Sequence, residues 1–406
     1  MEDSESSVKI SCLRGSDEIN PGLVDSDSFV NLNEDEKVIE LNFKEGPPTP
    51  YLQDKADEIE KNMKTGITIA MWKDFALSPG GLVNDRIRKQ GWPILLGLNP
   101  NACEEMIPEE NLREHPEYSQ VVLDVNRSLK RFPPGIPIEQ RLALQDQLTN
   151  LILRVITKYP HLRYYQGYHD VAITFLLVVG EELALRIMET LSTNHLRDCM
   201  EPTMEKTSLL LNYIFPLLKR LNPDLFSHLE RSGAGTMFCL PWFLTWFGHS
   251  LNHYKDVVRL YDAFLATAPL VPLYLTAVIV NYRASELLQL EPDMATVHCF
   301  LSQLPDDLPF DRLVSESVEL FAKFPPESIE AEVKERTRLE KEAQQKEEEK
   351  ARKRRRGAIK RGGSSLKAQL ERIVPSSRAQ LLLLAFSIAI GFYAYLRGNG
   401  GPPAIR

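Results

Sequence analysis

Apolar residues recur at helical spacing from residue 61 to residue 326, in blocks that prolines and glycines separate. The segment 140–156 is typical, because Leu148 and Leu151 lie on a face with little charge and Pro137 precedes the segment. Strict alternation of apolar and polar residues, which would indicate half-buried strands, is almost absent. The pattern predicts a single all-α domain over residues 61–326.

A stretch without charged residues at 264–280 could be either a membrane span or part of the core. Pro269 and Pro272 interrupt this stretch, and polar blocks lie close on both sides. We therefore expect a pair of core helices here.

Residues 1–60 form an acidic arm with 16 acidic and 5 basic side chains, within a chain whose formal net charge is −8. The arm is rich in Ser, Asp and Glu and has no sustained apolar period, so we expect it to be mostly disordered. It has no basic patch followed by an apolar run, and therefore no secretory signal is predicted.

Residues 327–378 are dominated by charge and predict a spacer. Oppositely charged residues four apart, such as Glu330 and Lys334, favour an exposed helix. Gly357 and Gly362 are expected to loosen the chain further along. Eight of the twelve residues in 350–361 are basic.

Residues 379–397 are predicted to be a transmembrane tail anchor, followed by a short lumenal tail at 398–406. The core of this segment, 381–396, contains no charged residue, and as a helix it would rise about 24 Å, slightly less than the roughly 30 Å of a hydrocarbon core. A buried terminal helix is the weaker alternative, because the charged spacer separates the segment from the domain. The basic run before it indicates that the domain faces the cytosol.

We expect the anchor to lie in the endoplasmic reticulum membrane. The outer mitochondrial membrane remains an alternative, since a short span with basic flanks fits both.

Common enzyme sites are not evident in the sequence. The five cysteines are scattered without a CxxC pair, and His249 and His253 have HxxxH spacing without the glutamate of a metalloprotease. No phosphate-binding GxxxxGK[ST] loop and no GxSxG motif is present. His169 and Asp170 adjoin, but neighbouring helix residues point apart, so no acid–base pair is expected. No metal site and no cofactor are predicted.

A first polar island lies in VVLDVNR, residues 121–127. Asp124 and Arg127 are three residues apart and share a helix face, where the carboxylate can hold the guanidinium extended. An oriented arginine suits a phosphate, although such a pair is more often an ordinary surface ion pair.

A second polar island lies in YYQGYHD, residues 164–170. Gln166 stands between tyrosines, one of them Tyr164, and Gly167 would let another backbone come close to Gln166. The YxQG sequence alone is usually only a helix start.

Four motifs in this order resemble the TBC domain of Rab GTPase-activating proteins, over residues 85–305. The first is RKQGWPILLG, which begins at Arg88 and includes Trp92; the two polar islands follow, with 39 residues from Arg127 to Gln166. The fourth runs from PWFLTWF at 241–247 to Asp262. The resemblance implies a single TBC-type helical domain, flanked here by the acidic arm, the spacer and one transmembrane helix.

This resemblance implies that Arg127 and Gln166 enter the active site of a Rab GTPase in trans. Arg127 would stabilise charge on the transferred phosphoryl group, and Gln166 would orient the attacking water. Asp124 would orient Arg127, with Tyr164 and Gly167 in support. GTP and magnesium would be carried by the GTPase, which we expect to belong to the early secretory pathway.

Three further positions of the resemblance, Arg88, Trp92 and Asp262, are interpreted as scaffold. Two departures from the common pattern are His169, where asparagine is common, and Tyr261, where tryptophan is common. They leave the identity of the GTPase open.

Two alternatives remain. A catalytically silent TBC scaffold would bind a Rab without accelerating hydrolysis, but such proteins typically lose one of the two catalytic residues. A membrane tether or nucleic-acid binder would use the basic run 350–361. No aromatic residues interleave that run, so membrane lipid is the expected contact and nucleic acid is not.

Overall fold

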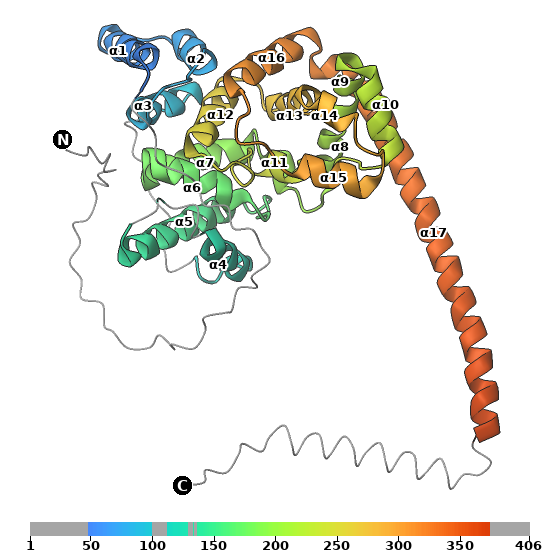
Figure 1. Ribbon diagram of the computed structural model, residues 1–406. Helices are drawn as coiled ribbons and strands as arrows, with labels where there is room; N and C mark the ends of the chain where they lie inside the picture. The colour runs from blue at the N-terminus through green and yellow to red at the C-terminus, as the bar shows by residue number, and fades with distance from the viewer. Residues whose placement is uncertain (1–47, 100–111, 129–132, 134–135, 374–406) are drawn as a thin grey trace, which may run out of the picture. The chain divides into compact units, whose positions relative to one another are not determined.

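The computed structural model describes residues 48–99, 112–128, 133 and 136–373, and every regular element within them is a helix (Figure 1). The predicted all-α fold is therefore confirmed. The helices before the middle of the chain are α1 (Pro50–Thr65), α2 (Ile69–Leu77), α3 (Asp85–Leu95), α4 (Tyr118–Arg127), α5 (Ile138–Lys158), α6 (Tyr168–Val179), α7 (Glu181–Thr193) and the 3-10 helix η3 (Arg197–Met200).

The remaining helices follow with short connections. They are α8 (Glu205–Leu211), α9 (Ile214–Leu221), α10 (Pro223–Ser232), the 3-10 helix η4 (Met237–Cys239), α11 (Leu240–Leu244), α12 (Tyr254–Ala266), α13 (Val271–Tyr282), α14 (Ala284–Leu287), α15 (Met294–Ser302), α16 (Phe310–Lys323) and α17 (Pro326–Ile373).

The fold begins earlier than the pattern of apolar residues predicts. Helix α1 starts at Pro50, where the side chain of Thr49 accepts a hydrogen bond from the Leu52 amide, and Ile59 is fully buried. Lys55 donates to three backbone carbonyls in 75–79, which ties α1 to the end of α2. The disorder predicted for residues 1–60 is therefore wrong for residues 50–60, which are helical, and residues 1–47 lie outside the described residues.

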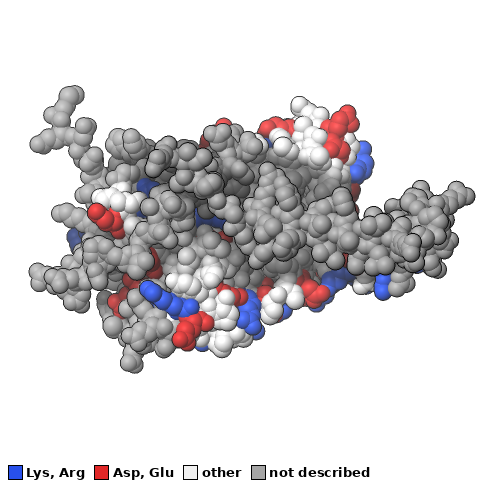
Figure 2. Space-filling model, turned by 90° about the horizontal axis from the view of Figure 1, so that it is seen from below, with Lys and Arg blue, Asp and Glu red and all other residues white. Residues whose placement is uncertain are grey.

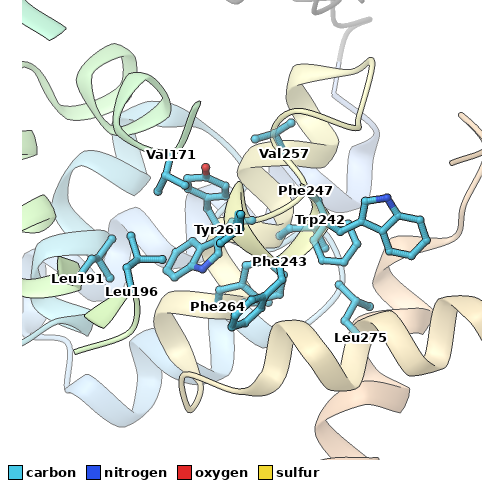
Figure 3. Packing of buried hydrophobic residues seen from close by; sticks show 14 of the residues in the cluster. Val171, Leu191, Leu196, Trp242, Phe243, Phe247, Val257, Tyr261, Phe264 and Leu275 are labelled. Carbon is cyan, nitrogen blue, oxygen red and sulfur yellow. The ribbon is translucent and has the colours of Figure 1, made fainter. Parts of the chain in front are cut away.

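The core lies around α12 and α13, the pair predicted for the uncharged stretch. Helix α13 packs between α9 and α16, and its residues from Val271 to Val280 are all buried. In Figure 3, Tyr261 and Phe264 of α12 lie among the aromatic side chains of the fourth motif. Within the described residues, no helix is both long and apolar enough to cross a membrane.

The two polar islands lie on α4 and at the start of α6. Helix α5 packs against α4, α6 and α7, while α3 packs against α6. The C-terminal residue of α4 is Arg127, and the loop 163–167 leads directly into α6. The packing of α4 against α6 therefore brings the two motifs together (Figure 1).

Helix α17 contains the predicted exposed spacer helix, with an ion pair of 2.7 Å between Glu330 and Lys334. The backbone stays helical past Gly357 and Gly362, where we expected a looser chain. Long flanks of Glu, Lys, Arg and Ala offset the roughly 1 kcal/mol that each glycine costs.

The chain divides into two compact units after Thr337, and the first turns of α17 belong to the first unit. The predicted transmembrane segment 379–397 and tail 398–406 lie outside the described residues.

Charged side chains of both signs are interspersed on the described part of the face in Figure 2.

Candidate functional site

Asp124 and Arg127 lie on the last turns of α4 and differ sharply in exposure. The carboxylate of Asp124 is 1% exposed, whereas the side chain of Arg127 is 67% exposed. Asp124 Oδ1 lies 3.9 Å from Arg127 Nη1, which is an ion-pair contact without a hydrogen bond. The carboxylate is thus fixed inside the protein while the guanidinium extends into solvent.

Tyr164 connects the two polar islands directly. Its hydroxyl donates to Asp124 Oδ2 over 3.0 Å, and its backbone amide donates to Glu117 Oε2 at the start of α4 over 3.1 Å. The loop that carries Gln166 is therefore fastened to both ends of the helix that carries Arg127. Burial, followed by the charge of Asp124, raises the pKa of Tyr164 well above its usual value, so this hydroxyl keeps its proton.

Gln166 is exposed and stands at the tip of a tight turn. Gly167 has φ +109°, and a Cβ at this position would lie 2.9 Å from Thr245 Cγ2. Tyr165 also fixes this loop to the fourth motif, since its hydroxyl donates to the Leu244 carbonyl over 2.8 Å. Glycine is required here both by the backbone conformation and by the close approach of the fourth motif.

The fourth motif braces this loop through an unusual turn, residues 245–249. Trp246 and Phe247 have φ values of 47° and 64°, a region that bulky side chains rarely adopt. Both side chains are buried against Phe264, with ring centroids 5.4 and 6.1 Å away, and this packing holds the strained backbone. A rigid support thus stands directly behind Gly167.

His169, Asp170 and His249 form a cluster that sequence reasoning missed. His169 Nε2 lies 3.7 Å from Asp170 Oδ2, so the expectation that these neighbours point apart is wrong. Both side chains are buried in the first turn of α6, and His249 Nδ1 lies 3.1 Å from the same carboxylate oxygen. The HxxxH spacing did single out His249, which lies in the turn after α11 and contacts an aspartate in the first turn of α6.

The three scaffold positions meet at one buried carboxylate. Asp262 Oδ1 accepts from Trp92 Nε1 over 2.7 Å and from Arg88 Nε over 3.2 Å, and Asp262 Oδ2 accepts from the Leu82 amide over 2.9 Å. Burial disfavours the charged guanidinium, but the charges of Asp262 and Asp85 and the hydrogen bond to Asp262 together outweigh it and raise the pKa of Arg88. This cluster joins α3 to α12, away from solvent.

Among the described residues, no three His, Cys, Asp or Glu side chains are grouped as a metal ion would require. The polar atoms of the site are instead arranged around one exposed arginine and one exposed amide. A guanidinium suits the oxygens of a phosphate, and an amide can hydrogen-bond a water.

Comparison with known proteins identifies the family. The sequence profile of the Rab-GTPase-TBC domain matches residues 85–288. Human TBC1 domain family member 20 is 48% identical over 291 residues, which cover 71% of this chain and 72% of that protein. The fission-yeast GTPase-activating protein gyp10 is 30% identical, over 61% of this chain and 67% of that protein.

The fold also matches the crystal structure of the Ypt/Rab-GAP domain of Gyp1p. The TM-score is 0.55 at 14% identity, over 67% of this chain and 99% of that one. The sequence profile, the relatives and the fold agree, and the chain belongs to the Rab-GTPase-TBC domain family of Rab GTPase-activating proteins.

Proposed function

We propose that the chain activates its Rab GTPase by supplying Arg127 and Gln166 in trans. Arg127 stabilises the charge that grows on the transferred phosphoryl oxygens, and Gln166 orients the attacking water through its amide. Asp124 orients Arg127, and Gly167 forms the tight turn against Thr245 that presents Gln166. GTP and its magnesium ion belong to the GTPase, so this chain needs no cofactor of its own.

One observation carries this proposal: the 3.0 Å hydrogen bond from Tyr164 to Asp124. It joins the motif of Arg127 to the motif of Gln166, although the two bonded residues are 40 positions apart. Arg127 and Gln166 are both exposed, while Asp124 is buried and Tyr164 is half-buried. A preorganised site of this kind lowers the reorganisation needed in the transition state.

The experiment is a single-turnover hydrolysis screen across GTP-loaded Rab proteins. Donated arginines are worth roughly 10³- to 10⁵-fold, so Arg127→Ala should lose about 4 to 7 kcal/mol of transition-state stabilisation and keep its helical content. Arg86→Ala is the matched control, because Arg86 is an arginine with an 80% exposed side chain on α3. Equal rates for wild type and Arg127→Ala would contradict the role of Arg127, and equal rates at the intrinsic rate of the Rab would indicate the silent scaffold.

We further propose that residues 379–397 anchor the protein in the endoplasmic reticulum membrane and place it on the early secretory pathway. The support is the uncharged segment 381–396 together with the basic run 350–361, which suits anionic headgroups on the cytosolic side.

Truncation before Arg378 should move the protein from the membrane pellet to the soluble fraction. Organelle fractionation of the full chain then separates reticulum from mitochondria. Continued pelleting of the truncated chain would rule the anchor out.

A further inference from the structure

The two oxygens of the Asp124 carboxylate are used unequally. Oδ2 accepts from Tyr164 over 3.0 Å and from Gln120 Nε2 over 3.0 Å. Oδ1 is buried and accepts no hydrogen bond, and it is the oxygen that faces Arg127 at 3.9 Å. One oxygen is therefore saturated by the protein, while the other is left for the guanidinium.

The proton of the Tyr164 hydroxyl determines this arrangement. An ionised carboxylate only accepts, so the single hydroxyl hydrogen of Tyr164 is directed at Asp124. The Tyr164 oxygen also lies 2.8 Å from His169 Nδ1. Because the hydroxyl has no second hydrogen, Nδ1 of His169 must be the donor of that bond.

The other nitrogen of His169 faces a second carboxylate. Nε2 lies 3.7 Å from Asp170 Oδ2, which also lies 3.1 Å from His249 Nδ1. His169 is 8% exposed and Asp170 is 4% exposed. With its Nδ1–H fixed on the Tyr164 hydroxyl, the neutral imidazole presents Nε2 to Asp170 at 3.7 Å, which is beyond hydrogen-bond distance.

We propose that His169 is a positioning residue for Arg127, because its Nδ1–H holds the Tyr164 hydroxyl with its proton on Asp124. This inference rests on the proposed function, since it presumes that Arg127 acts on the GTPase. Saturation of Oδ2 by Tyr164 leaves Oδ1 to receive the guanidinium in the complex. His169 touches neither substrate nor Arg127, and its effect passes through two hydrogen bonds.

Two substitutions of His169 separate this role from a purely structural one. In His169→Asn, the amide nitrogen takes the place of Nδ1 and can still donate to Tyr164. In His169→Gln, the amide reaches the place of Nε2 instead and faces Asp170. Both replacements are neutral and polar, so they differ mainly in which neighbour they serve.

Multiple-turnover assays with the cognate GTP-loaded Rab give kcat and KM for each variant. His169→Gln should lower kcat about ten-fold with KM unchanged, while His169→Asn stays within about two-fold of wild type, because one aligning hydrogen bond is worth about that much. Tyr164→Phe should lower kcat at least as much as His169→Gln. Tyr168→Phe is the matched control, since that hydroxyl lies 2.7 Å from Ser192 and serves another part of α6.

The proposal is overturned if His169→Gln equals His169→Asn in kcat, or if the loss appears only in KM or in the melting temperature. Its failure is distinct from failure of the proposed function. If Arg127→Ala abolishes acceleration while Tyr164→Phe and His169→Gln keep full kcat, the arginine acts without this positioning chain. If Arg127→Ala has no effect, the proposed function itself is wrong.

Discussion

Two arginine–aspartate pairs in this domain consist of the same residue types but differ in how far the arginine is exposed. The aspartates are equally buried, with Asp262 0% and Asp124 1% exposed. Their arginines differ, because Arg88 is 6% exposed and Arg127 is 67% exposed. Asp262 is bonded by Arg88, Trp92 and a backbone amide through both oxygens, whereas Asp124 keeps one oxygen without a hydrogen bond.

This difference in exposure distinguishes a pair that stabilises the fold from a pair proposed to act on a GTPase. The closed pair, Arg88 and Asp262, is complete within the molecule, and removing either partner leaves an uncompensated buried charge. The open pair, Arg127 and Asp124, is incomplete, because Asp124 Oδ1 is buried and accepts no hydrogen bond. A buried acceptor left in this state costs about 1 to 3 kcal/mol. That deficit at Asp124 remains until Arg127 approaches, and a bound GTPase would hold Arg127 in place. In the proposed function, this arrangement leaves Arg127 free to reach into the GTPase.

The largest effect that would sharpen this comparison is expected at the closed pair. Asp262→Ala leaves Arg88 buried without its main partner, so the free energy of unfolding should fall by about 3 to 5 kcal/mol. Denaturant unfolding measures this loss. Asp85→Ala is the control, since Asp85 contacts the same arginine from a side chain that is 39% exposed and should matter by less than about 1 kcal/mol. Equal losses for the two variants would show that the buried aspartate stabilises the fold no more than the exposed one does.

At the open pair the expected loss is in turnover. Asp124→Asn keeps the shape of the side chain but removes the charge that orients Arg127, so kcat should fall about 10²-fold, as a misplaced catalytic group typically causes. The free energy of unfolding should change little, because the Arg127 guanidinium is mostly hydrated. Stopped-flow hydrolysis and denaturant unfolding on the same preparation measure both quantities. A large loss of stability with intact kcat would make Asp124 a second scaffold residue.

The smallest effect concerns the support of the open site. Gly167→Ala places a methyl group 2.9 Å from Thr245 Cγ2 at a φ of +109°, so the free energy of unfolding should fall by about 1 to 3 kcal/mol. Thr245→Ser removes the clashing methyl group and keeps the hydroxyl that accepts from the His249 amide. The double variant should therefore recover part of the loss, namely the steric part and not the backbone strain. Full additivity of the two changes would show that the close approach does not matter.

The sequence predicts the elements better than it predicts their contacts. Helical periodicity indicates α5 and the α12–α13 pair, because burial of a face repeats with the helix itself. Helical periodicity does not predict the start of α1, since its capping residue Thr49 and the buried Lys55 lie in an acidic, mostly polar segment. Local pattern carries little information where burial is decided by a distant helix.

The site shows the same limit. The spacing of Asp124 and Arg127 on one helix face was readable from the sequence. Gly167 was singled out for the approach of another backbone, whereas the structure shows a φ of +109° and the Thr245 side chain there. The bond between Tyr164 and Asp124 was not readable from the sequence, because it depends on how α4 packs against the loop before α6. The contact of His249 with Asp170 joins residues 79 positions apart through a strained turn, which no periodicity encodes.

The central claim is that this chain supplies the glutamine as well as the arginine. The most direct measurement uses the cognate Rab with its own water-positioning glutamine replaced by alanine, loaded with GTP, in single-turnover hydrolysis. The wild-type chain should still accelerate this GTPase strongly, while Gln166→Ala should accelerate neither it nor the unaltered Rab. Loss of all acceleration by the wild-type chain, with Gln166→Ala remaining active on the unaltered Rab, would show that the GTPase uses its own glutamine and would contradict the account.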